Sequence, residues 1–336
     1  MEKDVLIKDI YKVIDKIKKC KSKSKYMLLL EDLEVLYMIC KELKIEDYPK
    51  LEDYSYKNYN VNYNKNICLM KKRMIDDKEY NLKFTQVLND INLSKYVEDQ
   101  NFIVTTYMNI NDIKTLVNDF LFQYDKTLYS YYLKIINEQR LIMGENLFSE
   151  EIKEFGLTFA SHSSFNPYIL INLQNKIFDA ATLVHELGHN YVELITLNQS
   201  SKVRQIRDIN CFEEVYSYYL TFAFINYLKN MKIYSKDLEN ITNGYNYVLI
   251  DSLNDLKNLY YISENDILDI ADALNYSFGI ALAYNFYDRS QQDLELTKKE
   301  LNEFIINNGI YNYYDLLKKH NLRDELLDKK ILQKYI

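Results

Sequence analysis

Residues that interrupt regular backbone structure are scarce in this chain, and this scarcity constrains its fold most strongly. Only six glycines and two prolines occur among 336 residues, about 2% of positions against about 12% in an average protein. A β-rich fold of this length needs many turns with positive or fixed φ, and those turns consume glycine and proline. The sequence therefore predicts a mainly α fold with long helices.

Charge and hydropathy restrict the class of protein further. At 48% hydrophobic and 27% charged residues, the chain can bury a full core in one large domain or two. The net charge of −7 provides no general basic surface, so we expect no nucleic-acid partner. The four cysteines are scattered and form no CxxC pair, which favours free thiols in a reducing compartment.

No segment of the sequence is typical of membrane insertion or export. Acids and lysines interrupt the apolar residues of the first nineteen positions, so no signal-peptide core is present there. The longest apolar run, 216–228, is too short to cross a bilayer. We expect a cytoplasmic protein with no membrane partner.

Periodicity predicts the order of the elements. Apolar residues recur at helical spacing in 5–19, 26–43 and 109–140. Two short β-prone runs, 155–160 and 168–173, flank a turn that contains Pro167. Beyond Asp179 the pattern is almost entirely helical.

The helical period is lost after the first two predicted helices. Residues 48–66 contain one of the two prolines and are expected to be irregular. We place a domain seam near 65–105. The expected domains are an N-terminal helical region, 1–105, which forms a partial lid or lobe, and a catalytic domain, 106–336.

The chemistry is concentrated in VHELGHN, residues 184–190, which contains two of the four histidines. On a helix, His185 and His189 share one face and can reach a single metal ion. Glu186 lies beside that ion, where it can take a proton from water. The pattern predicts a zinc-dependent hydrolase, with two buried structural histidines as the alternative.

A catalytic zinc site needs a third protein ligand. Glu193 lies eight residues from His185, a rise of about 12 Å, whereas ligand atoms of one zinc lie only about 3–4 Å apart. The adjacent acids Glu213 and Glu214 in the next predicted helix are better candidates. They point about 100° apart, so only one of them can bind the metal.

These residues resemble the thimet oligopeptidase and oligoendopeptidase F family of zinc peptidases. The similarity lies in PYILINLQNKIFDAATLVHELGHN and FEEVYS and extends over roughly 105–290. It implies a zincin-like, mainly α catalytic domain with a small β-sheet edge next to the active-site helix. It also implies one Zn²⁺ per chain, with Glu214 as the third ligand beside His185 and His189.

The resemblance extends to the segments that would bind substrate. FGLTFASHSSFNPYILIN resembles the family's edge strand along the cleft, which implies substrate contacts at Phe159, Ala160, Ser161 and His162. NYSFGIALA resembles the helix whose tyrosine donates to the reacting carbonyl, and the matching residue is Tyr276.

Three departures from the family pattern bear on function. Val192 stands where the family often has a histidine, and the histidine that the family has several residues before its catalytic tyrosine is absent in the residues just before Tyr276. The family's N-terminal lobe is also larger than the 105 residues before the match. The sequence therefore predicts an endopeptidase that acts on oligopeptides, with two alternatives. One is a protease dedicated to a single protein or precursor peptide, and the other is a zinc-binding pseudoenzyme that binds peptides.

Overall fold

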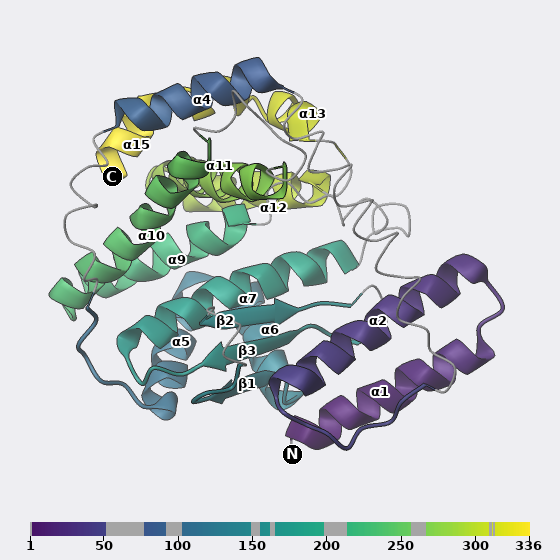
Figure 1. Ribbon diagram of the computed structural model, residues 1–336. Helices are drawn as coiled ribbons and strands as arrows, with labels where there is room; N and C mark the ends of the chain where they lie inside the picture. Colours follow the sequence, from purple (N-terminus) through teal and green to yellow (C-terminus); the bar gives the residue numbers. More distant parts are fainter. Residues whose placement is uncertain are drawn as a thin grey trace. The chain divides into compact units, whose positions relative to one another are not determined.

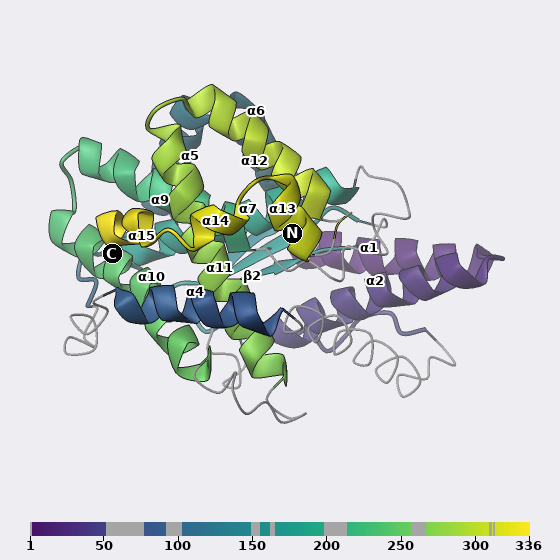
Figure 2. The same cartoon turned by 90° about the horizontal axis from the view of Figure 1, so that it is seen from above.

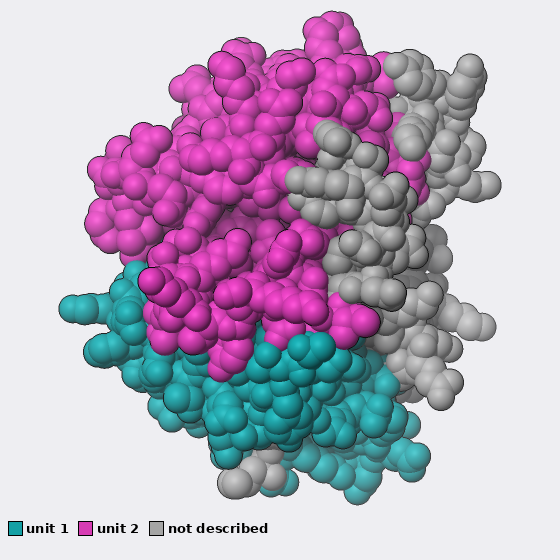
Figure 3. Space-filling model, turned by 90° about the vertical axis from the view of Figure 1, so that its left-hand side faces the viewer, with its two compact units in different colours: residues 1–54, 105–198 teal, residues 55–104, 199–336 magenta. Residues whose placement is uncertain are grey.

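The computed structural model divides the chain into two compact units (Figure 3). Unit 1 comprises Met1–Tyr54 and Thr105–Asn198, and unit 2 comprises Ser55–Val104 and Gln199–Ile336. Each unit therefore combines segments that are distant in sequence. The expected domain boundary at 105 stays a prediction. The structure describes residues 2–51, 77–91, 103–148, 155–161, 165–197, 214–256, 267–308, 311 and 313–336.

A three-stranded sheet forms the centre of unit 1. Its strands are β1 (Leu141–Gly144), β2 (Gly156–Phe159) and β3 (Tyr168–Asn172), in the order β1-β3-β2. β2 and β3 pair antiparallel, with Phe159 opposite Tyr168, as the two predicted β-prone runs require. β1 was not predicted, and it pairs parallel to β3. The prediction of a mainly α fold with a small sheet is confirmed.

Helices cover both faces of this sheet (Figure 1). α7 (Ile177–Leu197) packs against β2 and β3. α1 (Glu2–Lys19) and α2 (Lys23–Glu42) share a buried apolar cluster with Tyr168 and Leu170 of β3. Successive residues of a strand point to opposite faces, so β3, which is almost wholly buried, supplies core side chains to both layers.

A buried ionic cluster joins α1 to the sheet. Arg140 Nη2 lies 2.8 Å from Asp9 Oδ2 on α1, and the Tyr168 hydroxyl donates to the same oxygen at 2.8 Å. The Arg140 guanidinium also lies over the Tyr168 ring, 4.6 Å from its centroid. Burial raises the pKa of Tyr168 well above its usual range, so the phenol stays a hydrogen-bond donor.

Asp125 divides the predicted helix 109–140 into α5 (Ile110–Tyr124) and α6 (Lys126–Asn137). Its backbone is extended, and its carboxylate accepts hydrogen bonds from the amides of Thr127 and Leu128 at 2.8 and 3.0 Å. Aspartate is a strongly preferred N-cap residue. The helical pattern predicted over 109–140 therefore corresponds to two helices that are separated at this position. Both helices pack on α7.

All regular secondary structure in the described residues of unit 2 is helical. α9 is buried on nearly all sides and packs against α10 and α11. α11 in turn contacts α12, α14 and α15. The helices of this unit are α4 (Lys78–Asp90), α9 (Glu214–Asn230), α10 (Ser235–Leu256), α11 (Ile267–Ser290), α12 (Leu294–Asn308), α13 (Tyr313–Lys319), α14 (Arg323–Leu326) and α15 (Lys329–Tyr335).

α4 comes from the segment in which we placed a domain seam, and it was not predicted. It packs against α10 and α15 (Figure 2). Arg323 Nη2 lies 2.9 Å from Asp77 Oδ2, and the Tyr80 hydroxyl donates to the Arg323 carbonyl at 2.7 Å. These contacts join residues 246 and 243 positions apart in sequence. None of the helices described here is long and apolar enough to cross a membrane.

Candidate active site

The two motif histidines lie one turn apart on α7, as their spacing predicts. The ring centroids of His185 and His189 are 4.9 Å apart, and the rings are nearly perpendicular, with an interplanar angle of 81°. Both side chains are half-buried. They therefore combine a fixed position in the helix with access from outside the core.

The start of α7 is fixed by the buried carboxylate of Asp179. It accepts hydrogen bonds from the backbone amides of Gln174 and Lys176 at 3.0 and 3.1 Å. Burial raises the pKa of Asp179, and these amide donors oppose that shift. Negative charge near a helix N-terminus is favourable, so Asp179 holds the first turn of the helix that carries the motif.

Glu186 is 7% exposed and is held by β2. The Thr158 hydroxyl lies 2.9 Å from Glu186 Oε2 and also 2.9 Å from the Glu186 backbone oxygen. A hydroxyl has one proton to donate, so it serves one of these acceptors at a time. This contact fixes the carboxylate against the sheet.

Gly156 allows β2 to approach α7 this closely. A Cβ at this position would lie 2.6 Å from Glu186 Cγ and 2.8 Å from Thr182 Cγ2. Carbon atoms in favourable contact are about 3.5–4.0 Å apart. Any larger residue at 156 would therefore displace the Glu186 side chain.

The predicted substrate-binding residues lie at the end of β2, which is an edge strand of the sheet. Phe159 packs beside the apolar cluster of α1 and α2, because it points to the opposite face from Thr158. The Ser161 hydroxyl donates to the Phe165 carbonyl at 2.8 Å and accepts from its amide at 3.1 Å. Ala160 is partly exposed. His162 lies outside the described residues.

Unit 2 contains the predicted third ligand. Glu214 is the first residue of α9, and it is 6% exposed. Gly279 of α11 lies against it, because a Cβ on Gly279 would be 2.5 Å from Glu214 Cβ and 3.5 Å from its backbone. Glu213 lies outside the described residues. The absence of a side chain at 279 thus lets α11 pack directly on the first turn of α9.

The three candidate tyrosines of α11 differ in exposure. Tyr276 is 38% exposed, whereas Tyr284 and Tyr287 are 3% and 8% exposed. The Tyr284 hydroxyl donates to Asn246 Oδ1 at 2.6 Å, so it has a structural partner. A catalytic phenol must contact substrate, and Tyr276 is the tyrosine of the three with the access that this requires.

Sequence reasoning missed Gly156 and Thr158. Gly156 is one of only six glycines and lies within the predicted β-prone run 155–160, which is a signal for close approach of two backbones. Period-two alternation then places Thr158 on the same face as Gly156. Neither signal identifies Glu186 as the partner, because that contact depends on how β2 docks on α7.

Comparisons with known proteins identify the fold. Searches against protein-family models and curated protein sequences give no match. A solved chain provisionally assigned as oligoendopeptidase F aligns with 93% of this chain at a TM-score of 0.55 and 12% identity. A second such chain, from Bacillus anthracis str. Ames, aligns with 97% of this chain at a TM-score of 0.50 and 13% identity. PZ peptidase A, solved with an inhibitor, aligns with 99% of this chain at a TM-score of 0.55 and 10% identity.

At these identities the similarity is one of fold. This chain has the fold of the oligoendopeptidase F structures, as the sequence resemblance implied. It spans 64% of the length of the first of those chains, 68% of the second and 84% of PZ peptidase A.

Proposed function

We propose that this protein is a zinc-dependent endopeptidase that hydrolyses oligopeptides. The observation that carries the proposal is the arrangement on α7, where two half-buried histidines share one face. Beside them a glutamate is held by a strand that has no room for a larger residue at 156. The fold shared with the oligoendopeptidase F structures supports the same reaction class.

The metal would be held by His185 and His189 of unit 1 and Glu214 of unit 2. Imidazole nitrogen and carboxylate oxygen are the donors that zinc takes in catalytic sites, where a fourth position stays open. The i, i+4 spacing and the 4.9 Å separation of the two rings fit this role. Bound Zn²⁺ supplies Lewis acidity, which lowers the pKa of water to about 7.

Glu186 is the general base in this proposal. It takes a proton from the attacking water and then transfers that proton to the leaving amine. Thr158 orients its carboxylate from the side of β2. Tyr276, which is partly exposed on α11, donates a hydrogen bond to the oxyanion that develops at the scissile carbonyl.

The substrate backbone would add to the sheet along β2. β2 is an edge strand, and an extended peptide can pair with such an edge through main-chain hydrogen bonds. We assign this role to the backbone of Phe159, Ala160, Ser161 and His162. The side chain of Phe159 packs toward the core, and that of Ser161 closes the turn, so neither supplies specificity.

A protease dedicated to one protein or precursor peptide is the second candidate function. The chain spans 64% of the first oligoendopeptidase F chain that it resembles, so the substrate range of that whole protein is not carried over to this chain. A peptide-binding pseudoenzyme would retain the metal and lose turnover.

Metal content and hydrolysis of quenched peptides of about 5–15 residues test the proposal, with the native chain compared to Glu186→Gln. We expect one zinc per chain in both proteins and cleavage by the native chain alone. The loss in kcat should be at least about 10³-fold, because the general base itself is removed. Normal activity of Glu186→Gln would refute the mechanism, and zinc without cleavage by the native chain would favour the other two functions.

The role of Tyr276 is tested by Tyr276→Phe. We expect kcat to fall by about 100-fold at unchanged zinc content, which is the cost of losing one oxyanion donor. Tyr311→Phe is the matched control, because Tyr311 is also 38% exposed, and it should leave kcat within about twofold. Equal activity of the Tyr276→Phe variant and the native chain would remove Tyr276 from the mechanism.

A further inference from the structure

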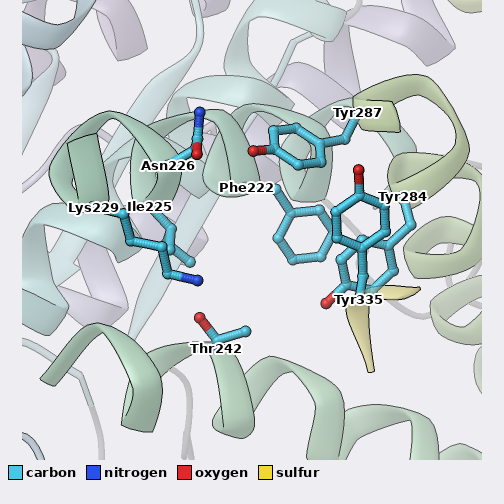
Figure 4. Close-up of a pocket in the computed structure, with 8 residues that line it drawn as sticks. All are labelled: Phe222, Ile225, Asn226, Lys229, Thr242, Tyr284, Tyr287 and Tyr335. Atoms are coloured by element: carbon cyan, nitrogen blue, oxygen red, sulfur yellow. The ribbon is translucent and has the colours of Figure 1, made fainter. Parts of the chain in front are cut away.

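A hollow with aromatic walls opens within unit 2, separate from the residues of the proposed mechanism. We call it the aromatic pocket, and its cavity volume is about 200 Å³. Sites for drug-sized ligands measure about 300–1,000 Å³, so this pocket suits a molecule of about one ring. Its lining residues are Phe222, Ile225, Asn226, Lys229, Thr242, Tyr284, Tyr287 and Tyr335 (Figure 4).

The wall of the aromatic pocket is a preformed stack of rings. Phe222 of α9 and Tyr284 of α11 lie parallel within 5°, with centroids 4.1 Å apart. The Tyr335 ring of α15 continues the stack, with its centroid 5.2 Å from that of Tyr284 and an interplanar angle of 4°. The hydrogen bond from Tyr284 to Asn246 fixes the central ring. Such a wall favours a flat apolar ligand without prior rearrangement of the protein.

Two donors on α9 open onto the same hollow. Asn226 and Lys229 are three residues apart, so their side chains share one face of the helix. Among the described residues, Lys229 forms no ion pair and the Asn226 side chain forms no hydrogen bond. An ammonium and an amide at this spacing can address the two oxygens of one carboxylate.

Tyr287 supplies a third donor. The residue is 8% exposed, yet its hydroxyl hydrogen-bonds to no group in the part of the chain that the structure describes. In Figure 4 this hydroxyl points toward Asn226. Burial raises the pKa of Tyr287 well above its usual range, so the phenol remains protonated and able to donate.

The charge around the pocket favours an anion. Lys229 is the single charged residue among the eight that line it. The Tyr335 hydroxyl donates to Asp288 at 2.7 Å, but that carboxylate is neutralised by Lys334 Nζ at 2.5 Å. The Thr242 hydroxyl donates to the Leu238 carbonyl at 2.7 Å. The Thr242 hydroxyl can therefore accept a hydrogen bond from a ligand but has no proton left to donate to it.

We propose that the aromatic pocket binds a small carboxylic acid with a flat apolar body. The carboxylate accepts from Lys229 and Asn226, and the body lies against the ring stack. Asn226 follows Glu214 on α9 by twelve residues, a rise of about 18 Å. The pocket is thus distinct from the proposed zinc ligand. A free acid and the C-terminal residue of a peptide share this chemistry.

Isothermal titration with 3-phenylpropionate tests the proposal, and 3-phenylpropanamide serves as the uncharged analogue. We expect the amide to bind at least tenfold more weakly, because it cannot pair with an ammonium. Lys229→Gln should weaken binding of 3-phenylpropionate by at least tenfold. Lys236→Gln is the matched control, since Lys236 is an exposed lysine on α10 outside the pocket, and it should bind as the native chain does.

Three results would overturn the proposal: no binding of the acid, equal binding of the acid and the amide, or full retention of binding in Lys229→Gln. The last result would also place the acid elsewhere, including at the proposed zinc. N-acetylphenylalanine distinguishes the source of the ligand. Binding that depends on Lys229 and is tighter than for 3-phenylpropionate identifies a peptide C-terminus, and weaker binding identifies a free acid.

Discussion

Two glutamates in different units are each met by a glycine of a neighbouring element, and the two contacts differ in kind. In unit 1, a Cβ on Gly156 would meet Glu186 at Cγ, 2.6 Å away, and at Oε1, 3.0 Å away. In unit 2, a Cβ on Gly279 would meet Glu214 at Cβ, 2.5 Å away, and at the backbone, 3.5 Å away. The first contact positions a carboxylate, whereas the second positions a helix.

Because of this difference, we expect a larger residue at 156 to affect activity and a larger residue at 279 to affect stability. The Glu186 side chain can rotate away from an added methyl group, so the fold survives while the carboxylate moves. Glu214 Cβ is bound to the backbone of α9, so an added methyl group must push α11 and α9 apart. A glycine in close contact with a neighbouring element can therefore support either catalysis or packing. Its role depends on whether it contacts the outer atoms of a side chain or atoms at the backbone.

The largest effect in this comparison is expected for Gly156→Ala. The added methyl group should displace Glu186 and lower kcat by about 100-fold, because misplacement of a reacting group by about 1 Å has this cost. Zinc content should be unchanged, since His185 and His189 are not displaced. Steady-state kinetics and metal analysis check this prediction.

The matched control is Gly244→Ala. Gly244 lies on α10 with no atom within 4 Å of an added Cβ, so kcat should not change. Activity of Gly156→Ala within about threefold of the native chain would show that the position of Glu186 does not limit turnover, and the two glycine contacts would then differ only in stability.

Gly279→Ala should act on stability. Overpacking of a core costs about 1–3 kcal/mol, and alanine recovers about 1 kcal/mol of helix propensity relative to glycine. We expect a net loss of up to about 2 kcal/mol in the free energy of unfolding. Chemical denaturation followed by circular dichroism measures it.

The control variant Gly244→Ala is expected to change the free energy of unfolding in the opposite direction. Gly244→Ala should raise the free energy of unfolding by about 0.5–1 kcal/mol, since it gains propensity and meets nothing. If Gly279→Ala stabilised the protein equally, α11 would not be held against Glu214, and unit 2 would need a different account of its packing.

Much of the fold could be predicted from the sequence, because the relevant signals are local. The scarcity of glycine and proline indicated helices, and two short β-prone runs on either side of a turn indicated β2 and β3. β1 was missed because four residues are too few to show a period. α4 was missed because its residues join unit 2 through contacts with residues about 245 positions away, at Arg323.

The candidate site divides in the same way. His185 and His189 were predicted to share a face from spacing alone, and α7 places them so. The assignment of Glu214 rather than Glu213 needed a family resemblance, because helix geometry alone allows either. Gly156 and Thr158 were missed because their roles depend on the docking of a strand onto a helix, which no local pattern encodes.

Thr158 gives the smallest and most specific of the expected effects. Thr158→Val keeps the shape of the side chain and removes the hydrogen bond to Glu186 Oε2. A hydrogen bond to a charged group contributes about 1.5–3 kcal/mol at most, and Glu186 keeps its packing, so we expect a loss in kcat of about tenfold at unchanged KM. Thr158→Ser restores the hydroxyl and should recover most of kcat, which loss of packing alone would not allow. An equal deficit in the valine and serine variants would mean that the Thr158 methyl group supports β2, and only Gly156 would then position Glu186.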